Sequence, residues 1–217
     1  ALAVNPDKLY IKIRYKGELM ILAEERASVL LKGEQFQIVD GFKGMELEGI
    51  EYEPLFDYAN PEKKAWYVVL ADFVTMDDGT GIVHIAPAFG EDDYQVGKKY
   101  DLPVIQLVKL DGTFPDEVKP WKGQFVKDAD PKIIKHLEER NLLEGVHEYV
   151  HDYPFCWRCD SPLLYYAMES WFIAMTKVQN SLTNNNNNIN WFPSHLKQGR
   201  FGDFINDVKD WALSRKR

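Results

Sequence analysis

The segment from Gly79 to Tyr94 holds the residue types that most directly suggest chemistry. A strand flanked by glycines would deliver His84, and a loop with Pro and Gly then leads into a helix whose first residues, including Asp93, are acidic. Histidine can transfer protons near neutral pH, and a carboxylate at a loop–helix junction can bind a cationic amine. A structural interpretation competes, because aspartate caps a helix start and a single strand histidine is often a core residue. From the pattern alone, the structural interpretation has the greater weight.

A second group consists of Cys156 and Cys159, preceded by His147 and His151. Two cysteines at this spacing supply half of a tetrahedral zinc site. The histidines could supply the other half, but only four residues separate His151 from Cys156, which is far tighter than the usual finger spacing of about 12 residues. We therefore favour a half-site whose other ligands lie outside this chain. Two unligated thiols stay an alternative, and a redox motif would need a βαβ context that the sequence does not show.

Aromatic and basic residues interleave late in the chain, in Ser170–Phe172, Trp191–Pro193 and Arg200–Gly202. Such residues can stack on RNA bases, but aromatic side chains more often form a core, and we expect a core here. The net charge of −8 also argues against a chain whose whole surface grips nucleic acid.

The elements that must position these residues are mainly strands in the first half and helices later. Residues 9–23 predict a hairpin, and Gln35–Val39 predicts a strand closed by Asp40-Gly41. The run of asparagines from Asn184 to Asn188 predicts a solvated loop. Further strands are expected at 66–74 (a long central one), 82–86 and 102–108, and helices at 27–32, at 91–100, from Asp130-Pro131 onward and at 199–214.

Composition describes a globular chain of one large or two small domains, with 217 residues of which 45% are hydrophobic. A change in composition near Tyr153-Pro154 predicts a first domain at 1–152 and a second at 153–217. We find no signal peptide and no apolar run of about 20 residues that could span a membrane. Both ends break off inside element patterns, so we expect a piece of a longer cytoplasmic polypeptide.

Taken together, these motifs resemble the isoleucyl-tRNA synthetase family over essentially the whole chain and in the family's order. The valyl family typically carries Lys, and the leucyl family Met, where His84 stands; an editing domain of either relative stays an alternative. The matching segments are Gly79–Tyr94 (editing signature), His151–Leu163 (leaving the editing insertion), and Ser170–Phe172, Gly199–Phe201 and Asp210–Arg215 (return to the catalytic core).

The resemblance implies an α+β fold, with a β-barrel-like editing domain decorated by short helices and a C-terminal mixed or helical connecting segment. It also implies hydrolysis of valine mistakenly esterified to tRNA(Ile). A hydrophobic pocket resolves one methylene by only about 1–3 kcal/mol, so a second pocket that admits valine and excludes isoleucine supplies the remaining discrimination.

The resemblance also assigns roles to four residues of this sequence. Asp93 would bind the substrate's α-ammonium, and His84 would contact the substrate or the terminal ribose and help to reject isoleucine. Thr80 and Gly81 would shape the pocket wall. Water would attack the ester, with no covalent intermediate and no metal. The implied partners are the acceptor end of tRNA(Ile) and the rest of the parent synthetase, and we expect a monomer with no membrane contact.

Three departures from the family pattern limit what this chain should do alone. The family's Thr-rich segment, which precedes the position of Ala1, is absent, so we expect an incomplete pocket. A second Cys pair is missing, so zinc belongs at most to the full-length parent. Neither ATP signature of the family is present, so ATP belongs to the parent's catalytic domain. A non-catalytic module that positions tRNA and connects two halves of a larger enzyme is therefore the alternative function.

Overall fold

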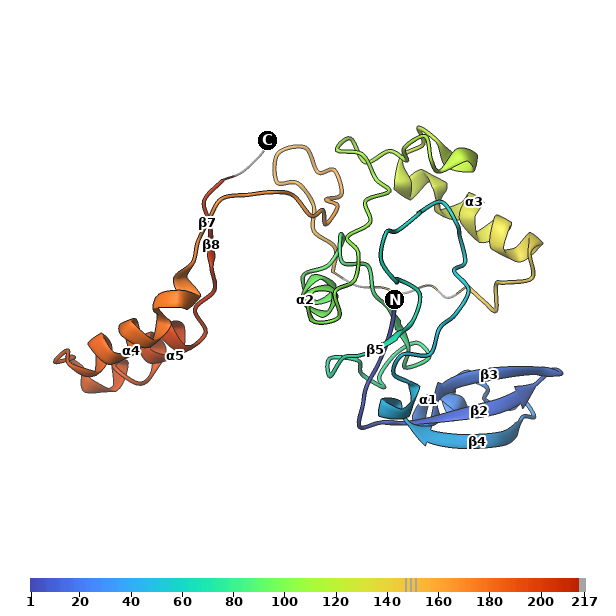
Figure 1. The fold of residues 1–217 in the computed structure, drawn as a ribbon, viewed down its shortest axis with the longest axis horizontal. Helices are drawn as coiled ribbons and strands as arrows, with labels where there is room; N and C mark the ends of the chain where they lie inside the picture. Colours follow the sequence, from blue (N-terminus) through green and yellow to red (C-terminus); the bar gives the residue numbers. More distant parts are fainter. Residues whose placement is uncertain (147, 149, 151, 215–217) are drawn as a thin grey trace. The chain divides into compact units, whose positions relative to one another are not determined.

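The computed structural model describes residues 1–146, 148, 150 and 152–214. The chain divides into two compact units, Ala1–Ala167 and Met168–Arg217 (Figure 1). The boundary predicted after residue 152 rests on a change in composition, and it stays a prediction.

A small three-stranded sheet in the first unit carries part of the candidate site. β1 (Leu2–Val4) lies between β5 (Val68–Leu70), which runs parallel to it, and β6 (Val83–His84), which runs antiparallel. The prediction of a long central strand at 66–74 is wrong, because β5 has three residues and lies at the sheet edge. The chain leaves the sheet after β5, where the side chain of Asn5 binds backbone carbonyls that a longer strand would use in its ladder.

The predicted hairpin at 9–23 is confirmed. β2 (Leu9–Tyr15) pairs with β3 (Glu18–Ala23), and β4 (Gln37–Lys43) pairs with the other edge of β2. Lys16 and Gly17 connect the hairpin with φ values of +49° and +89°. Two successive left-handed residues make the tight turn that matches the twist of the two strands.

β4 and α1 differ from their predicted bounds. The predicted strand closure at Asp40-Gly41 is wrong, because β4 continues through these residues. The pairing shifts by one residue between Lys12 and Ile13 of β2, so a bulge absorbs the extra residue and bends the strand. α1 (Glu24–Leu30) begins three residues before the predicted helix, and its acidic first turn favours that start. Figure 1 shows α1 beside the three strands.

Two longer helices follow in the first unit. α2 (Glu91–Lys99) confirms the helix predicted at 91–100. α3 (Val126–Glu139) begins before the predicted start and contains Pro131. The helix persists through the proline because Ala129, completely buried, packs with Trp121 in a local core. Packing of an apolar face can outweigh the one intrahelical hydrogen bond that a proline removes.

The strand predicted at 102–108 is wrong. The backbone of this segment bonds to partners outside any strand ladder: the Leu102 N–H donates to Gly97 O, and the Tyr166 hydroxyl donates to Val108 O. Two of its apolar residues contribute to cores without forming a sheet. Leu102 packs in the main cluster, and Leu107 packs against the cluster that contains Trp121.

Apolar packing divides into three clusters within the first unit. The first joins β1 and β5 to α2, the second lies between α1 and its sheet, and the third lies beneath α3. Their buried members are Ala3, Val4, Tyr10, Ala23, Leu47, Val69, Ala71, Val74, Met76, Ile85, Val96 and Leu102; Ile11, Ile13, Tyr15, Leu22 and Ala27; and Val118, Trp121 and Ala129. Tyr10 and Ala23 thereby tie the hairpin to the first cluster.

The second unit pairs two segments that lie far apart in sequence. β7 (Phe172–Ile173) and β8 (Trp211–Ala212) form a two-stranded antiparallel pair, and α4 (Gln179–Asn187) packs with α5 (Arg200–Asn206). The helix predicted at 199–214 is therefore too long. Short 3-10 helices occur at Gly44–Leu47, Lys119–Trp121, Met175–Val178 and Ser194–Leu196.

The asparagine run is not a solvated loop, so that prediction is wrong. Most of it forms the last turn of α4, and Asn186 is buried. The Trp191 indole N–H donates to Asn186 Oδ1 at 2.8 Å, and Asn186 Nδ2 donates to Lys197 O at 2.8 Å. A buried amide with both ends satisfied stabilises the element that holds it.

The fold class is confirmed as a mixture of helices and small sheets. The strands of the described residues pair as two three-stranded sheets and one two-stranded sheet, and a closed barrel stays a prediction. Within the described part of the chain, no helix is both long and apolar enough to cross a membrane.

Candidate functional site

His84 lies on β6, opposite Leu2 of the central strand. The strand is shorter than the predicted 82–86, but the Ile85 N–H extends the pairing by donating to Ala1 O at 2.8 Å. Desolvation lowers the pKa of His84. A lowered pKa keeps the imidazole neutral near pH 7, so that it can accept a hydrogen bond or a proton.

Asp93 is the third residue of α2, and its carboxylate folds back over the helix start. The backbone N–H of Ala86 donates to this carboxylate. A Cβ at Gly90, the residue before the helix, would lie 2.2 Å from Asp93 Oδ2. The absence of a side chain at Gly90 therefore lets the carboxylate reach the loop that follows His84.

The electrostatic environment of Asp93 suits an amine ligand. Desolvation raises the pKa of this half-buried carboxyl group, and the charge of Asp92 raises the pKa further. The hydrogen bond from the Ala86 N–H lowers the pKa of Asp93. A cation that binds beside the carboxylate stabilises its charged form. Binding of an ammonium group would therefore offset the cost of holding this charge in a partly desolvated place.

The structure brings Asp93 close to the segment that follows His84. The Ala86 N–H, two residues after His84, donates to the Asp93 carboxylate. A short backbone segment therefore links β6, which carries His84, to the carboxylate of α2.

Thr80 and Gly81 lie on the loop that precedes β6. Gly81 is buried with φ +74°, and a Cβ there would meet the Cβ of Ala23 at 2.5 Å. Thr80 is exposed, and its backbone carbonyl accepts the Ala23 N–H at 2.9 Å. Among the described residues, no hydrogen bond or ion pair joins Thr80 or Gly81 to Asp93. Their role as a pocket wall stays a prediction.

Sequence reasoning missed the residues that hold this loop. Arg26 and Tyr10 donate to its carbonyls, yet each reads in the sequence as an ordinary helix or strand residue. More than 50 residues separate Arg26 from Gly79, so no local spacing could have indicated the contact.

Two cavities lie away from the predicted editing residues. One, of about 370 Å³ in the first unit, is lined by Tyr58–Pro61, Ile105–Leu107, Pro115 and Glu117. The other, of about 250 Å³ in the second unit, lies between α4, α5 and the segment at Lys197. Neither His84 nor Asp93 lines these two cavities.

Cys156 and Cys159 lie on a tight hairpin closed by the bridge between Phe155 and Pro162. The Cys156 N–H donates to Ser161 O at 2.9 Å, and the Asp160 N–H donates to Cys156 O at 2.8 Å. The Ser161 hydroxyl lies 3.0 Å from Cys159 Sγ. Hydrogen bonds from the Ser161 side chain, the Ser161 backbone and the Cys156 thiol lower the pKa of Cys159, which favours a thiolate.

This hairpin fits two of the four ligands of a tetrahedral zinc site. Within the described residues, no group of three or more His, Cys, Asp or Glu side chains is placed to hold a metal. His147 and His151 lie outside the described residues. The half-site therefore stays a prediction, as does the local four-ligand site.

The aromatic residues predicted as core are only partly so in the second unit. Trp191 and Phe201 pack against each other, with ring centroids 4.8 Å apart. Trp171 and Phe192 are 80% and 98% exposed, and Phe172 is also exposed, so the core prediction is wrong for these three.

Comparisons of the sequence with known proteins identify the family of this chain. Residues 15–217 match the family model described as tRNA synthetases class I (I, L, M and V). The chain is similar to isoleucine–tRNA ligases of Clostridium acetobutylicum (54% identical over 217 residues), Thermoplasma volcanium (46% over 216) and Bacillus thuringiensis (44% over 220). In each case the match covers 100% of this chain and 21% of the relative.

The fold also has a solved counterpart, the crystal structure of GlLeuRS-CP1. It aligns with a TM-score of 0.52 and 18% identity, covering 69% of this chain and 78% of that one. A likeness at this identity supports the fold alone, whereas the family model and the relatives rest on sequence. The chain spans about a fifth of the length of the ligases that it matches, and it belongs to the class I tRNA synthetases of the isoleucine, leucine, methionine and valine group.

Proposed function

We propose that this chain carries an editing site of an isoleucine–tRNA ligase, which hydrolyses valine mistakenly esterified to tRNA(Ile). The observation that carries the proposal is the half-buried carboxylate of Asp93, which accepts the Ala86 N–H two residues after His84. The sequence likeness to isoleucine–tRNA ligases supports it.

In this proposal Asp93 holds the α-ammonium of the aminoacyl group. The carboxylate is partly buried, and partial burial strengthens its attraction for an ammonium group relative to an exposed pair. Fixing the ammonium fixes the ester carbonyl a few bonds away, so that a water molecule can meet it in a reactive orientation.

In this proposal His84, on β6, serves as the neutral partner of Asp93. Its lowered pKa leaves the imidazole able to accept a hydrogen bond from a ribose hydroxyl or from the attacking water. The water oxygen bonds to the ester carbonyl carbon and the bond to the ribose oxygen breaks. One water proton goes to that ribose oxygen, which releases valine and tRNA.

The test is deacylation of Val-tRNA(Ile) by a full-length ligase that carries this sequence, with Asp93→Ala beside Asp92→Ala. Asp92 is the matched control because it is the adjacent carboxylate and is exposed. We expect Asp93→Ala to slow deacylation by about 100-fold or more, since a charged contact is worth about 1.5–3 kcal/mol and more where it positions the reacting group. Isoleucine activation should stay near normal in both variants.

Unchanged deacylation in Asp93→Ala would refute the assignment. If the unaltered ligase fails to hydrolyse Val-tRNA(Ile), the alternative of a non-catalytic module that positions tRNA and connects the halves of the enzyme is favoured instead.

A further inference from the structure

The loop between β5 and β6, residues 71–82, connects the sheet to the predicted pocket wall and then to His84. Arg26 of α1 reaches this loop with its guanidinium. Its Nε donates to Gly79 O at 2.8 Å, and its Nη1 donates to Asp77 O at 3.0 Å and to Met76 O at 3.4 Å. A planar guanidinium fork can bond several acceptors at once, which a lysine ammonium does less well.

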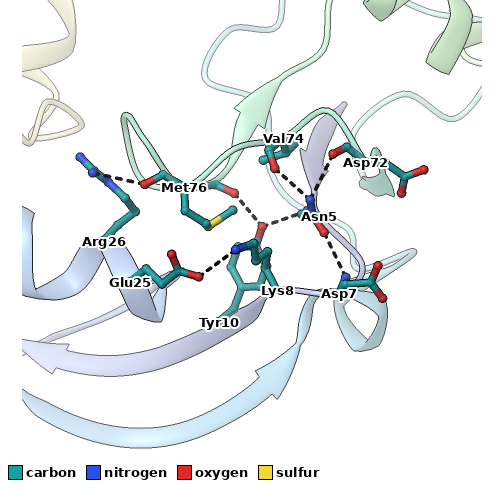
Figure 2. Close-up of polar contacts among 10 residues, drawn as sticks. Asn5, Asp7, Lys8, Tyr10, Glu25, Arg26, Asp72, Val74 and Met76 are labelled. Atoms are coloured by element: carbon teal, nitrogen blue, oxygen red, sulfur yellow. Dashed lines mark hydrogen bonds and ion pairs between the residues drawn. The ribbon is translucent and has the colours of Figure 1, made fainter.

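Tyr10 of β2 holds the end of the same loop. Its side chain is completely buried, and its hydroxyl donates to Gly81 O at 2.7 Å while accepting the Asn5 N–H at 2.9 Å. The Asn5 side chain in turn donates to Asp72 O at 3.2 Å and to Val74 O at 3.0 Å. Figure 2 shows Asn5, Tyr10 and Arg26 around the loop.

The hairpin backbone adds one more bond, because the Ala23 N–H donates to Thr80 O at 2.9 Å. The carbonyls of five of the six residues from Met76 to Gly81 thus accept hydrogen bonds from residues of the β2–β3–α1 segment. Gly79 and Gly81 have φ values of +56° and +74°. Glycine can adopt more backbone conformations than other residues. These hydrogen bonds therefore restrict the loop to one backbone conformation at the two glycines.

We propose that Arg26 and Tyr10 are positioning residues for the editing site, which they serve by fixing the path of the loop that carries Thr80 and Gly81 and leads to His84. The proposal rests on the proposed function. Neither residue touches the substrate in this account. Both act through the loop backbone, whereas Asp93 depends on α2 and on Ala86.

The test uses a full-length ligase that carries this sequence, with hydrogen exchange and steady-state deacylation measured on the same variants. Arg26→Ala removes the three guanidinium bonds, and Arg26→Lys keeps the charge without the fork. Arg14→Ala is the matched control, since Arg14 is an exposed arginine on β2 and is not the donor in these bonds. Tyr10→Phe keeps the buried ring and removes only the hydroxyl.

We expect Arg26→Ala and Tyr10→Phe each to raise amide exchange in residues 76–84 by about tenfold, because a hydrogen bond to a charged or buried group is worth roughly one factor of ten or more. Exchange in α2 should stay unchanged. Arg26→Lys should recover part of the protection, and Arg14→Ala should behave like the unaltered protein.

Deacylation should show a split between kcat and KM. Loosening the loop should lower kcat about tenfold through misplacement of His84 and the pocket wall, while KM changes little because Asp93 still binds the ammonium. Unchanged exchange at 76–84, exchange raised equally in α2, or normal kcat in Arg26→Ala would each overturn the proposal.

Failure of the proposed function gives a different pattern. Asp93→Ala would then leave deacylation intact, while Arg26→Ala would still loosen residues 76–84. That result would overturn the link to editing and leave Arg26 only as an anchor of the loop.

Discussion

Two connecting segments of the first unit are held by different kinds of hydrogen bond. The loop at residues 71–82 depends on donors from Asn5, Tyr10, Ala23 and Arg26, which lie roughly 50 to 75 residues earlier in the chain. The cysteine hairpin, residues 155–162, is held by bonds among its own residues: Cys156 with Ser161, and Asp160 with Cys156.

The conformation of the loop at residues 71–82 therefore depends on the rest of the domain, whereas the conformation of the cysteine hairpin depends on its own hydrogen bonds. A remote substitution can displace the loop, and with it Thr80, Gly81 and the approach to His84. The hydrogen bonds that shape the cysteine hairpin lie within it. The hairpin can therefore hold its two thiols in place for the other ligands of the predicted zinc site. Function at the loop should therefore be sensitive to distant mutations, and function at the hairpin should not.

The strongest way to break the loop is to add a side chain at Gly81. Gly81→Ala places a Cβ 2.5 Å from that of Ala23 in a left-handed conformation, and we expect a loss of about 2–5 kcal/mol in the free energy of unfolding. Gly79→Ala is the control, because Gly79 has φ +56° and open space around it; strain alone should cost about 1 kcal/mol. Urea unfolding measures both, and equal losses would contradict the tight contact.

A smaller effect is expected in the hairpin. Ser161→Ala removes the hydroxyl that lies against Cys159 Sγ and should raise the pKa of the Cys159 thiol, while the backbone bond from Ser161 keeps part of the shift. The thiolate fraction at neutral pH then falls, and alkylation of Cys159 should slow by a few-fold, on the order of 2–5 times. Mass spectrometry after iodoacetamide treatment with a chelator present follows this one thiol.

Ser28→Ala, on α1, serves as the control for that experiment. Thermal unfolding should barely change in Ser161→Ala, because the backbone bonds that shape the hairpin stay in place. Faster alkylation, or a large loss of stability, would contradict a self-contained hairpin.

The smallest effect concerns the pKa of Asp93, which the charge of the adjacent Asp92 raises. Asp92→Asn should therefore lower it. Deacylation needs ionised Asp93 and declines as the pH falls through that pKa, so the acid limb should move to lower pH by a few tenths of a unit, as expected for an exposed charge. The shift should disappear in high salt, and a shift to higher pH would contradict the account.

Local patterns predicted the elements whose stability is local. The hairpin at 9–23 has a two-residue turn flanked by β-forming residues, and α2 has an acidic start and a basic end. The residue types of the segment from Gly79 to Tyr94 indicated His84 and Asp93, and the family resemblance supplied their roles. The structure adds the hydrogen bond from the Ala86 N–H to the Asp93 carboxylate.

Tertiary contacts decided the elements that the sequence misjudged. The run at 66–74 has strong β propensity, but only three of its residues find strand partners. The asparagine run looked solvated because its buried member is satisfied by Trp191 and Lys197, which follow later. Nothing in the sequence indicated the roles of Arg26 and Tyr10, because their partners are backbone carbonyls, which every residue type has.

The most direct test of the central claim compares two substrates in single-turnover hydrolysis by a full-length ligase that carries this sequence. The account predicts that Val-tRNA(Ile) is hydrolysed at least about tenfold faster than Ile-tRNA(Ile), since excluding one methylene is worth about 1–3 kcal/mol. Equal rates for the two esters, or hydrolysis of neither, would contradict an editing site built on Asp93 and His84.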